Sequence, residues 1–345
     1  MDYEVLAFVG RFQPFHKGHK AVVDAALGRA KQVAIVIGSH DQPRNSRNPF
    51  TTSERIEMIT SLYPDEVKAG KIHFVPQVDH AYNLDRWIAG VTTGVEAVVT
   101  QGGWTDTPPR IGLIGHSKDH TSFYLKSFPR WGSVEVDNVD GIDATAVRVA
   151  LFSGYRASVD EAIVPQTVAA WLDRWIKKDQ TAYYQVVAEM DFLTRYRKQF
   201  ESLPYPPIFQ TTDAVVVSSG NVLLVKRGAQ PGQGLWALPG GFLNAHELIE
   251  DGCIRELREE TKIGIPDPVL RGSIVNRRTF DDPNRSLRGR TITTAFLIRL
   301  ADRKELPKIK GSDDAVKAQW VPLSNLRRSM MYEDHFDMVE ALVGI

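Results

Sequence analysis

The sequence predicts an α/β protein that is divided into two domains. Short apolar runs alternate with helical stretches in the first half, which is typical of an α/β sheet. New strands begin after the proline-rich stretch at residues 202–207, which ends any helix and stiffens the chain. A length of 345 residues is long for one domain and comfortable for two. We therefore expect domains at residues 1–180 and 208–345, joined by a helical and proline-rich linker at 181–207.

The composition favours small-molecule partners over polyanions. Basic and acidic residues number 42 each, so the chain has no global attraction for nucleic acid or an anionic membrane. Cys253 is the single cysteine and cannot form an intrachain disulfide. No run approaches 18 apolar residues, and no charged-then-apolar leader precedes the first strand. We expect a soluble, cytoplasmic protein without membrane contact, and the sequence leaves monomer and homo-oligomer open.

The start of the chain predicts a phosphate site. Residues 5–9 form an apolar run typical of a buried parallel strand, and a loop from Gly10 leads to a helical pattern that ends near residue 30. A strand, a glycine-bearing loop and a helix start create an anion site from backbone N–H groups and the helix dipole. His16 and His19 share the first helical turn, and Lys17 adds charge. The alternatives for these two histidines are a pair that binds zinc and two surface residues without a ligand.

The elements that follow continue the α/β pattern. We expect a strand at 32–37, a capping box at residues 51–54 that starts a helix ending near 62, and strands near 72–75, 97–100 and 111–114. The active face should lie at the carboxyl ends of the strands. A helical pattern then covers 158–199, and a hairpin joins strands at 212–217 and 222–226.

The histidine segment GRFQPFHKGH resembles the H-x-G-H signature of nucleotidylyltransferases. The resemblance implies a Rossmann-like domain with a parallel sheet, which transfers an adenylyl group from ATP to a phosphate acceptor. It implies that histidines and basic residues stabilise charge on the triphosphate, with substrate contacts from Gly10, Arg11, Phe12 and Lys17. No covalent intermediate is needed, so orientation and electrostatics carry the catalysis.

Two later stretches resemble the same family. Residues 141–148 are similar to its late motif I-S-x-T-x-x-R, in which Thr145 and Arg148 would hold ATP phosphates, while Asp143 replaces the usual Ser. Residues 115–125 resemble the nicotinamide mononucleotide (NMN) adenylyltransferase branch and include Lys118, whose alternative is a solvated loop lysine. Asn83 and Trp87 would share a helix face, where an indole stacks on a pyridinium ring and an amide pairs with a carboxamide. A core tryptophan is the alternative.

Acidic residues on one helix predict a cation site in the second half. A helix over 245–262 places Glu256 and Glu260 on the core-facing stripe together with Cys253, and Glu259 lies beside them. Like charges repel, and partial burial adds a desolvation cost. A hard divalent ion such as Mg²⁺ prefers carboxylate oxygen and commonly bridges to phosphates. A solvated, charge-rich helix is the alternative.

The spacing of Gly241, Glu247 and residues 255–260 resembles the Nudix box. The resemblance implies an α/β/α domain with a mixed sheet in which Glu256, Glu259 and Glu260 hold the metals and Arg255 orients a glutamate. One departure is Lys262, where the family usually has Gly, and we expect Gly264 to end the helix instead. A cationic loop at 280–290 is a solvated hairpin tip on its own composition. In the Nudix-fused family, Arg285, Arg288 or Arg290 would contact phosphate or the distal ribose.

Together the two motif sets resemble the family of bifunctional NMN adenylyltransferases fused to a Nudix hydrolase. The resemblance implies that NMN and ATP give NAD and pyrophosphate in the first domain. It also implies Mg²⁺-dependent or Mn²⁺-dependent hydrolysis of ADP-ribose to AMP and ribose 5-phosphate in the second. One rival is a Nudix domain that only senses a nucleotide, and another is adenylyl transfer to phosphopantetheine or flavin mononucleotide.

Overall fold

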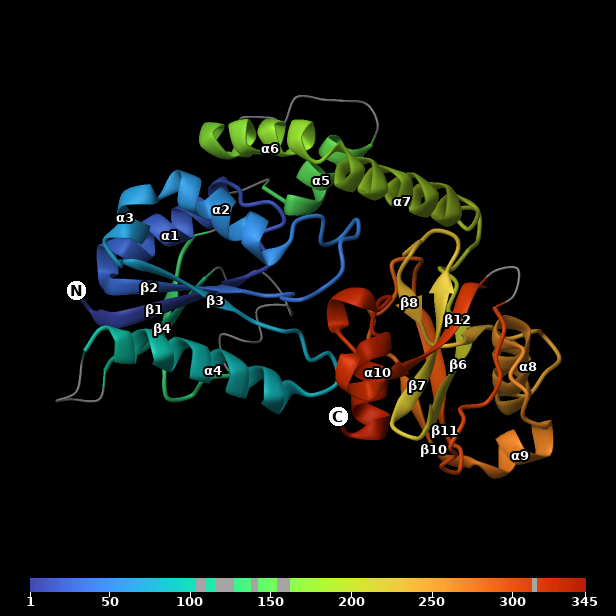
Figure 1. Ribbon diagram of the computed structural model, residues 1–345. Coiled ribbons are helices and arrows are strands. Elements are labelled where there is room, and N and C mark those ends of the chain that lie inside the picture. The colour runs from blue at the N-terminus through green and yellow to red at the C-terminus, as the bar shows by residue number, and fades with distance from the viewer. Residues whose placement is uncertain (104–108, 116–126, 138–141, 154–161, 312–314) are drawn as a thin grey trace. The chain divides into compact units, whose positions relative to one another are not determined.

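A computed structural model describes the chain except for residues 104–108, 116–126, 138–141, 154–161 and 312–314 (Figure 1). The described chain divides into two compact units, Met1–Val187 and Ala188–Ile345, which we call unit 1 and unit 2. Helix α7 (Gln180–Lys198) spans this division. The domain limits at 180 and 208 and the separate linker stay predictions.

Unit 1 is organised around a parallel sheet. Among the described residues the sheet has five strands in the order β3-β2-β1-β4-β5, and every pair is parallel. This order, with β1 at the centre, confirms the predicted Rossmann-like domain and brings the carboxyl ends of all the strands to one edge. The strands are β1 (Tyr3–Gly10), β2 (Ala30–Ile37), β3 (Ile72–Pro76), β4 (Ile111–Gly115) and β5 (Gly132–Glu135).

Helices cover both faces of this sheet (Figure 1). Helices α1 and α2 lie on one face and α4 on the other. Buried side chains of β1, including Val5 and Ala7, pack against Val91 and Val95 of α4. Because both faces are covered, the central parts of β1 and β2 are apolar and buried, which explains why their sequence runs are continuous. The helices are α1 (Lys17–Arg29), α2 (Thr52–Leu62), α3 (Pro64–Lys68), α4 (Leu84–Gln101), α5 (Ala144–Phe152) and α6 (Gln166–Lys178).

The prediction of a strand at residues 97–100 is wrong, because this segment forms the last turn of α4. Its β-branched residues favour a strand locally. Val91, Val95, Val98 and Val99 are nevertheless buried along one side of α4, at helical spacing. Packing on the sheet therefore overrides local propensity. The helical region expected at 158–199 is described from residue 162 onward, where Asp179 separates α6 from α7.

Unit 2 contains a mixed sheet, as predicted. Its main path in the described residues is β10-β11-β6-β7-β12, in which β11 and β6 are parallel and the other pairs are antiparallel. The expected hairpin is present, with Val217 opposite Val222. The short strands β8 and β9 pair with β7 and β6. The strands are β6 (Phe209–Ser218), β7 (Asn221–Arg227), β8 (Trp236–Ala237), β9 (Gly240–Phe242), β10 (Ile274–Phe280), β11 (Thr291–Arg299) and β12 (Ala315–Pro322).

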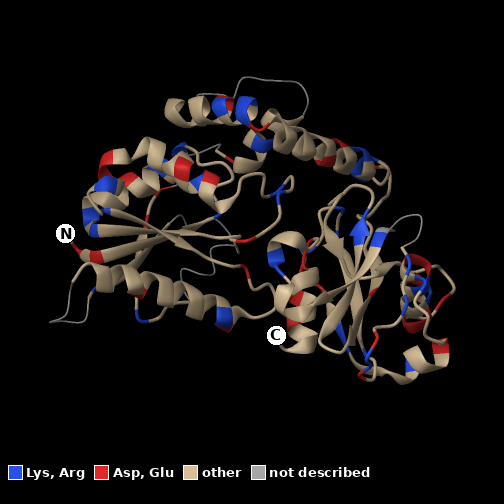
Figure 2. Ribbon diagram, in the orientation of Figure 1, with Lys and Arg blue, Asp and Glu red and all other residues tan. Residues whose placement is uncertain are grey.

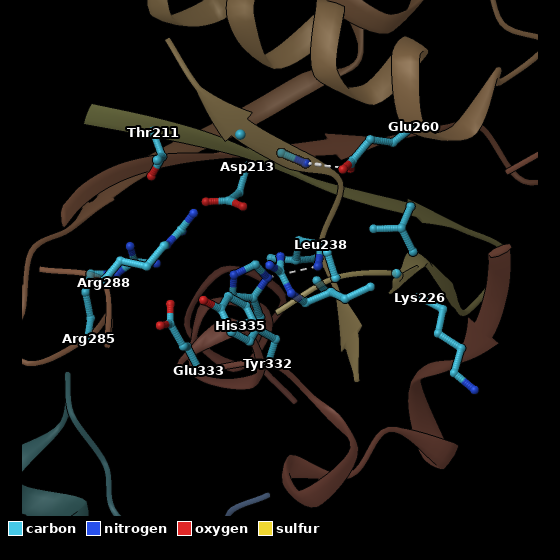
Figure 3. Close-up of a pocket in the computed structure, with 17 residues that line it drawn as sticks. Thr211, Asp213, Lys226, Leu238, Glu260, Arg285, Arg288, Tyr332, Glu333 and His335 are labelled. Atoms are coloured by element: carbon cyan, nitrogen blue, oxygen red, sulfur yellow. Dashed lines mark hydrogen bonds between the residues drawn. The ribbon is translucent and has the colours of Figure 1, made fainter. Parts of the chain in front are cut away.

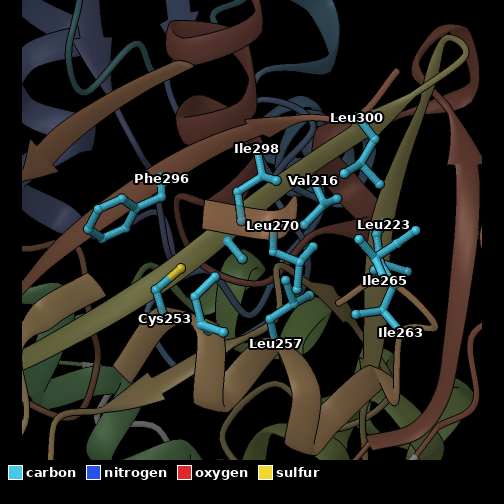
Figure 4. Packing of buried hydrophobic residues seen from close by; sticks show 12 residues of the cluster. Val216, Leu223, Cys253, Leu257, Ile263, Ile265, Leu270, Phe296, Ile298 and Leu300 are labelled. Carbon is cyan, nitrogen blue, oxygen red and sulfur yellow. The ribbon is translucent and has the colours of Figure 1, made fainter. Parts of the chain in front are cut away.

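Two helices sandwich this sheet. Helix α8 (Ile249–Thr261) contacts β6 and β9, and α10 (His335–Val343) contacts β6, β10 and β11. Figure 4 shows the apolar cluster under α8, where Cys253 and Leu257 face Val216 and Ile298. The burial of Cys253 confirms its interpretation as a core residue. The short helix α9 (Asp267–Gly272) and the 3₁₀ turns Leu323–Asn325 and Arg328–Met330 complete the unit.

Both ends of α8 differ from the expectation. The helix begins at Ile249 and not near residue 245. At the other end, Lys262 itself adopts the left-handed conformation with φ of 44° and donates its N–H to the Arg258 carbonyl. The expectation that Gly264 ends the helix is therefore wrong. A lysine performs the turn at which the family usually has glycine.

Basic and acidic residues are interspersed along the ribbon of the described elements (Figure 2). This distribution agrees with the balanced composition. Across the described residues, none of the helices combines the length and the apolar character that crossing a bilayer requires.

Candidate functional sites

The loop between β1 and α1 has a shape that its residue types dictate. Phe12 is buried and has φ of 53°, so its ring turns back under the end of β1. A Cβ at Gly10 would lie 2.7 Å from that ring, so only glycine fits there. The ring of Phe12 packs edge-on against His19, with centroids 4.9 Å apart. Gly10 and Phe12 therefore support the first turn of α1.

The two predicted histidines form one unit at the N-terminus of α1. His19 donates its backbone N–H to His16 Nδ1 at 3.3 Å, and His16 donates its backbone N–H to His19 Nδ1 at 3.2 Å. The rings stack with centroids 3.6 Å apart. Since each Nδ1 accepts a hydrogen bond, each neutral ring carries its proton on Nε2. The capping box thus fixes two Nε2–H donors beside the positive end of a helix dipole.

Arg148 joins this loop from α5. It donates to the Gln13 carbonyl at 2.8 Å and to Thr145 Oγ1 at 3.1 Å. Burial, followed by the repulsion of Arg11, lowers the pKa of Arg148 to about 10. Asp143 accepts the Thr145 N–H and caps α5. The residue that replaces the usual serine therefore performs a helix-capping role.

A buried arginine that the sequence reasoning missed holds the neighbouring loops. Arg55, which is 1% exposed, donates to the carbonyls of Arg11, Gly38 and Ser39 at 2.6–3.1 Å. Asp79 accepts both the N–H and the hydroxyl of Ser39. Arg55 lies on the same side of α2 as the buried residues Met58 and Ile59. An arginine at such a position is the sequence signal that could have identified it, since arginines are rarely buried without partners.

The remaining predicted residues of unit 1 have different positions. Asn83 is the N-cap of α4 and accepts the Arg86 N–H at 3.0 Å. Trp87 is half-buried and contacts the Phe128 ring, with centroids 6.1 Å apart. Lys17 is exposed at the start of α1. Lys118 lies outside the described residues. The structure thus brings His16, His19, Thr145 and Arg148 to one loop.

Unit 2 contains a cavity of about 450 Å³ at the junction of β6, β7, β9 and the start of α10 (Figure 3). Glu260 lines one part of it, and Arg288 and His335 line others. A cavity of this size accommodates a small ligand.

Arg255 organises the acidic end of α8. It donates twice to Glu247, at 2.6 and 3.0 Å, once to Glu256 at 2.7 Å and once to Glu259 at 3.0 Å. These contacts lower the pKa of Glu247 to about 2. Arg255 also donates to the Phe242 carbonyl of β9. The predicted orienting role of Arg255 therefore agrees with its contacts.

Glu260 is the carboxyl group at this end of α8 that has no cationic hydrogen-bond partner among the described residues. It is half-buried and accepts the Gly240 N–H at 3.0 Å, and no cation bonds to it among the described residues. Desolvation raises its pKa to about 8, and desolvation also raises the pKa of Glu256. A Cβ at Gly241 would lie 2.6 Å from the Glu256 carboxylate, so glycine lets strand β9 approach it. Two desolvated carboxylates beside an exposed third one, Glu259, fit a hard divalent cation.

Polar groups without partners line the rest of the cavity. Asp213 is buried and accepts from Thr293 Oγ1 through Oδ2, while Oδ1 has no hydrogen bond within the described chain. His335 Nδ1 accepts the Leu238 N–H at 2.9 Å, so a neutral ring carries its proton on Nε2. Burial and three nearby arginines hold the pKa of His335 well below 6.5, which keeps it neutral. The Tyr332 hydroxyl and Arg288 Nε are also buried and unpaired in the part of the chain that is described.

The three predicted arginines of the cationic loop at 280–290 make different contacts. Arg285 is buried and donates twice to Asp334, at 2.8 and 2.9 Å. Arg290 donates to the Asp281 carbonyl at its own loop. Arg288 lies over the Phe242 ring, 4.9 Å from its centroid. Of the three predicted arginines, Arg288 is therefore the one whose guanidinium makes no hydrogen bond among the described residues.

Asp213, Tyr332 and His335 were missed by sequence reasoning. Asp213 could have been found, because an aspartate inside the apolar run of β6 contradicts strand propensity. Tyr332 and His335 carry no comparable signal, because they reach the cavity from a turn and the first residue of α10.

Comparisons with known proteins cover both units. Residues 7–150 match the Cytidylyltransferase-like family, and residues 209–342 match the NUDIX domain family. The chain is 35% identical over 185 residues to a nicotinamide/nicotinic acid mononucleotide adenylyltransferase of Acinetobacter baylyi, covering 53% of this chain and 92% of that protein. It is 30% identical over 129 residues to an ADP-ribose pyrophosphatase of Methanocaldococcus jannaschii, covering 37% of this chain and 69% of that protein.

The whole chain also resembles a solved structure. A bifunctional NMN adenylyltransferase/ADP ribose pyrophosphatase from Francisella tularensis superposes with a TM-score of 0.88 at 34% identity, covering 99% of both chains. A second structure of that enzyme, complexed with AMP and a manganese ion, gives 0.88 at 33% identity with the same coverage.

Proposed function

This chain belongs to the family of bifunctional NMN adenylyltransferases/ADP-ribose pyrophosphatases, and from that premise we propose that it catalyses both reactions. Unit 1 would transfer the adenylyl group of ATP to NMN, giving NAD and pyrophosphate. Unit 2 would hydrolyse ADP-ribose to AMP and ribose 5-phosphate. Two separate sets of phosphate-handling residues, one in each unit, support two separate chemistries.

The adenylyl transfer rests on the histidine capping box. A phosphate oxygen of NMN would attack the α-phosphorus of ATP, and the bond from that phosphorus to the bridging oxygen of the leaving pyrophosphate would break. Negative charge then grows on the pyrophosphate. The Nε2–H groups of His16 and His19 are fixed as donors for that charge, and Arg148 adds a cation at the same loop. Mg²⁺ bound to the phosphates would neutralise part of the same charge.

The acceptor assignment is tested by pyrophosphate release from ATP across a panel of acceptors. We expect NMN to be the best acceptor, ahead of phosphopantetheine and flavin mononucleotide. Trp87→Ala should raise KM for NMN if the indole stacks on the pyridinium ring. An unchanged KM would remove Trp87 from the site, and a strong preference for phosphopantetheine would overturn the acceptor assignment itself.

The hydrolysis rests on Glu260, a desolvated carboxylate that lines the cavity and lacks a cationic partner within the described chain. Glu256, Glu259 and Glu260 would hold Mg²⁺ or Mn²⁺, which would activate water and polarise the diphosphate when bound. The chain's own contribution is orientation. Arg255 fixes Glu256 and Glu259, and the Gly240 N–H fixes Glu260. Arg288 offers a cation to the diphosphate from across the cavity.

The substrate of unit 2 is tested by incubation with ADP-ribose, NAD, ADP-glucose and dinucleoside polyphosphates, each with Mg²⁺ or Mn²⁺. We expect ADP-ribose to be cleaved most efficiently, with AMP and ribose 5-phosphate as products. Cleavage of another compound with ADP-ribose untouched would overturn the assignment. Binding of ADP-ribose without cleavage would favour a sensor.

A further inference from the structure

Gln13 anchors the histidine loop, residues 10–19, from its buried side. Its side chain is 2% exposed and lies three residues before His16 in the sequence. The side-chain nitrogen donates to the Phe50 carbonyl at 2.8 Å, and the side-chain oxygen accepts the Phe50 N–H at 2.9 Å. The backbone carbonyl of Gln13 accepts from Arg148 at 2.8 Å. The position of the histidine loop therefore depends on where Phe50 lies.

The peptide group between Pro49 and Phe50 is held from two sides. Its N–H donates to Gln13, and its carbonyl accepts a hydrogen bond from Arg44 Nη1. The Phe50 ring is buried and packs edge-on against Trp175, with centroids 4.9 Å apart. Arg44 is therefore the side chain that fixes this peptide group against Gln13.

Glu54, in the first turn of α2, holds Arg44 in place. Its two oxygens accept from both terminal nitrogens of Arg44, at 3.0 and 3.1 Å, and this ion pair is partly buried. The same carboxylate accepts the Thr51 N–H at 2.7 Å and the Trp175 Nε1–H at 2.6 Å. A capping box needs only the Thr51 contact from this glutamate. The bidentate pair with Arg44 gives a fixed geometry in addition to the cap.

Trp175 brings α6 into this network. Helix α6 packs beside α2 (Figure 1) and lies beyond residues 7–150, which match the family model of unit 1. Trp175 is buried, and the guanidinium of Arg44 lies over its ring, 5.4 Å from the centroid. Helix α6 therefore supports the ion pair with both an N–H donor and an aromatic face.

We propose that Arg44 and Glu54 are positioning residues for adenylyl transfer. Glu54 orients Arg44, and Arg44 holds Gln13 through the peptide group that contacts them both. Gln13 in turn sets the histidine loop, so that the two Nε2–H donors face the phosphate charge. This inference rests on the proposed adenylyl transfer. It adds side chains that act through the histidine loop and not on a substrate.

Arg44→Met tests the positioning directly, because it removes the donors and keeps the length of the stem. A misplacement of about 1 Å can lower a rate about 100-fold, so we expect kcat for pyrophosphate release to fall about 10- to 100-fold. KM for NMN should change less than about 2-fold, because the histidine donors act on charge that grows in the transition state. Arg44→Lys keeps one donor and should recover part of the rate. Glu54→Gln should lower kcat less, about 3- to 10-fold, because it keeps an acceptor and loses only the charge.

The route through Gln13 predicts that two substitutions are coupled. Gln13→Met and Arg44→Met should each lower kcat, and the double variant should be less than about 2-fold slower than the slower single variant. Losses that multiply in the double variant would overturn this route.

Tyr63→Phe is the control for a loss of stability alone. It removes a hydrogen bond of 2.8 Å from a buried ring to Asp24, at the other end of α2. It should lower the melting temperature and leave kcat unchanged. Hydrolysis of ADP-ribose should be unchanged in every variant. An unchanged kcat in folded Arg44→Met would overturn the proposal, and so would a raised KM for NMN at unchanged kcat.

Failure of the proposed function gives a different result, because wild-type protein would then release no pyrophosphate with any acceptor. Hydrogen exchange tests the positioning without a reaction. Amides of residues 11–19 should exchange at least about 5-fold faster in Arg44→Met than in wild type and Tyr63→Phe. Equal exchange in the three proteins would overturn the positioning role.

Discussion

The two sites that we propose for phosphate chemistry differ in the charges that they present. In unit 1 the loop after β1 presents donors, namely His16 and His19 at a helix N-terminus with Arg148 beside them. In unit 2 the corresponding helix presents carboxylates, and Glu260 is desolvated without a cation among the described residues. The first arrangement attracts phosphate directly. The second repels it unless a divalent ion intervenes.

This difference shows what each site needs in order to form. The histidine pair is locked by its own backbone hydrogen bonds, so its donors are in place before any ligand arrives. The glutamate set is held by Arg255 and by the Gly240 N–H, yet the raised pKa of Glu260 shows that its ionised form is poorly stabilised. We therefore expect unit 1 to need a divalent ion mainly because the ion binds its substrate. Unit 2 should need one because the ion binds its glutamates.

The largest expected effect breaks the site of unit 2 alone. Glu260→Gln removes the charge and keeps the shape, so hydrolysis of ADP-ribose should fall on the order of 100- to 1000-fold, as for other preorganised electrostatic groups. Glu259→Gln should act in the same direction. Adenylyl transfer should persist in both. The measurement is both activities on purified protein, with Glu250→Gln as control, because Glu250 lies on α8 but pairs with Arg271. Joint loss of both reactions would mean a shared site.

The reciprocal experiment breaks the site of unit 1. His19→Ala should remove an Nε2–H donor and raise the barrier of adenylyl transfer by about 2–3 kcal/mol, while hydrolysis persists. His16→Ala also removes the helix cap, at about 1 kcal/mol of stability. His16→Asn keeps a cap acceptor and still lacks the donor, so it separates the two roles. Full activity of folded His16→Asn would show that capping is its only role.

Much of this comparison was predictable from the sequence. The histidine loop, the capping box at Thr51 and the order of strand, loop and helix around Glu260 are local patterns, and local patterns determine local geometry. The strand predicted at 97–100 was wrong because burial of α4 against the sheet makes this segment helical. Asp213 and His335 meet through the tertiary fold, from β6 and α10, so spacing along the chain could not place them together.

The buried histidine of unit 2 should make the stability of that unit depend on pH. His335 is buried and faces Arg227, Arg285 and Arg288, and its burial, followed by these arginines, keeps its pKa in the fold well below 6.5. Below pH 6.5 the unfolded chain binds a proton that the folded chain does not, so the free energy of unfolding falls as pH falls. Between pH 6.5 and 5.5 wild type should lose about 1 kcal/mol more than His335→Asn, which keeps the acceptor for Leu238. Denaturant melts of unit 2 at both pH values provide the test, and equal losses in both proteins would contradict it.

The smallest expected effect concerns the end of α8. Lys262 has φ of 44°, a conformation that costs a non-glycine residue about 1 kcal/mol, whereas glycine adds some entropy to the unfolded chain. Lys262→Gly should therefore stabilise unit 2 by about 0.5 kcal/mol and leave both activities unchanged. Lys262→Ala, which keeps the strain, is the matched control in the same melting experiment. A destabilised Lys262→Gly would mean that the lysine side chain contributes more than the turn costs.

The pairing of β6 with β11 sets an order in which this chain is able to fold during synthesis. The five described strands of the sheet in unit 1 have all emerged by Glu135, and the central strand β1 pairs with β2, which follows it after one helix. In unit 2, by contrast, Thr212 pairs with Thr294, so β6 waits for most of the unit before its parallel partner exists. Such distant pairings are slow to form and leave an apolar strand edge open in the meantime. The nascent second half is therefore where chaperone dependence and aggregation of this protein should concentrate.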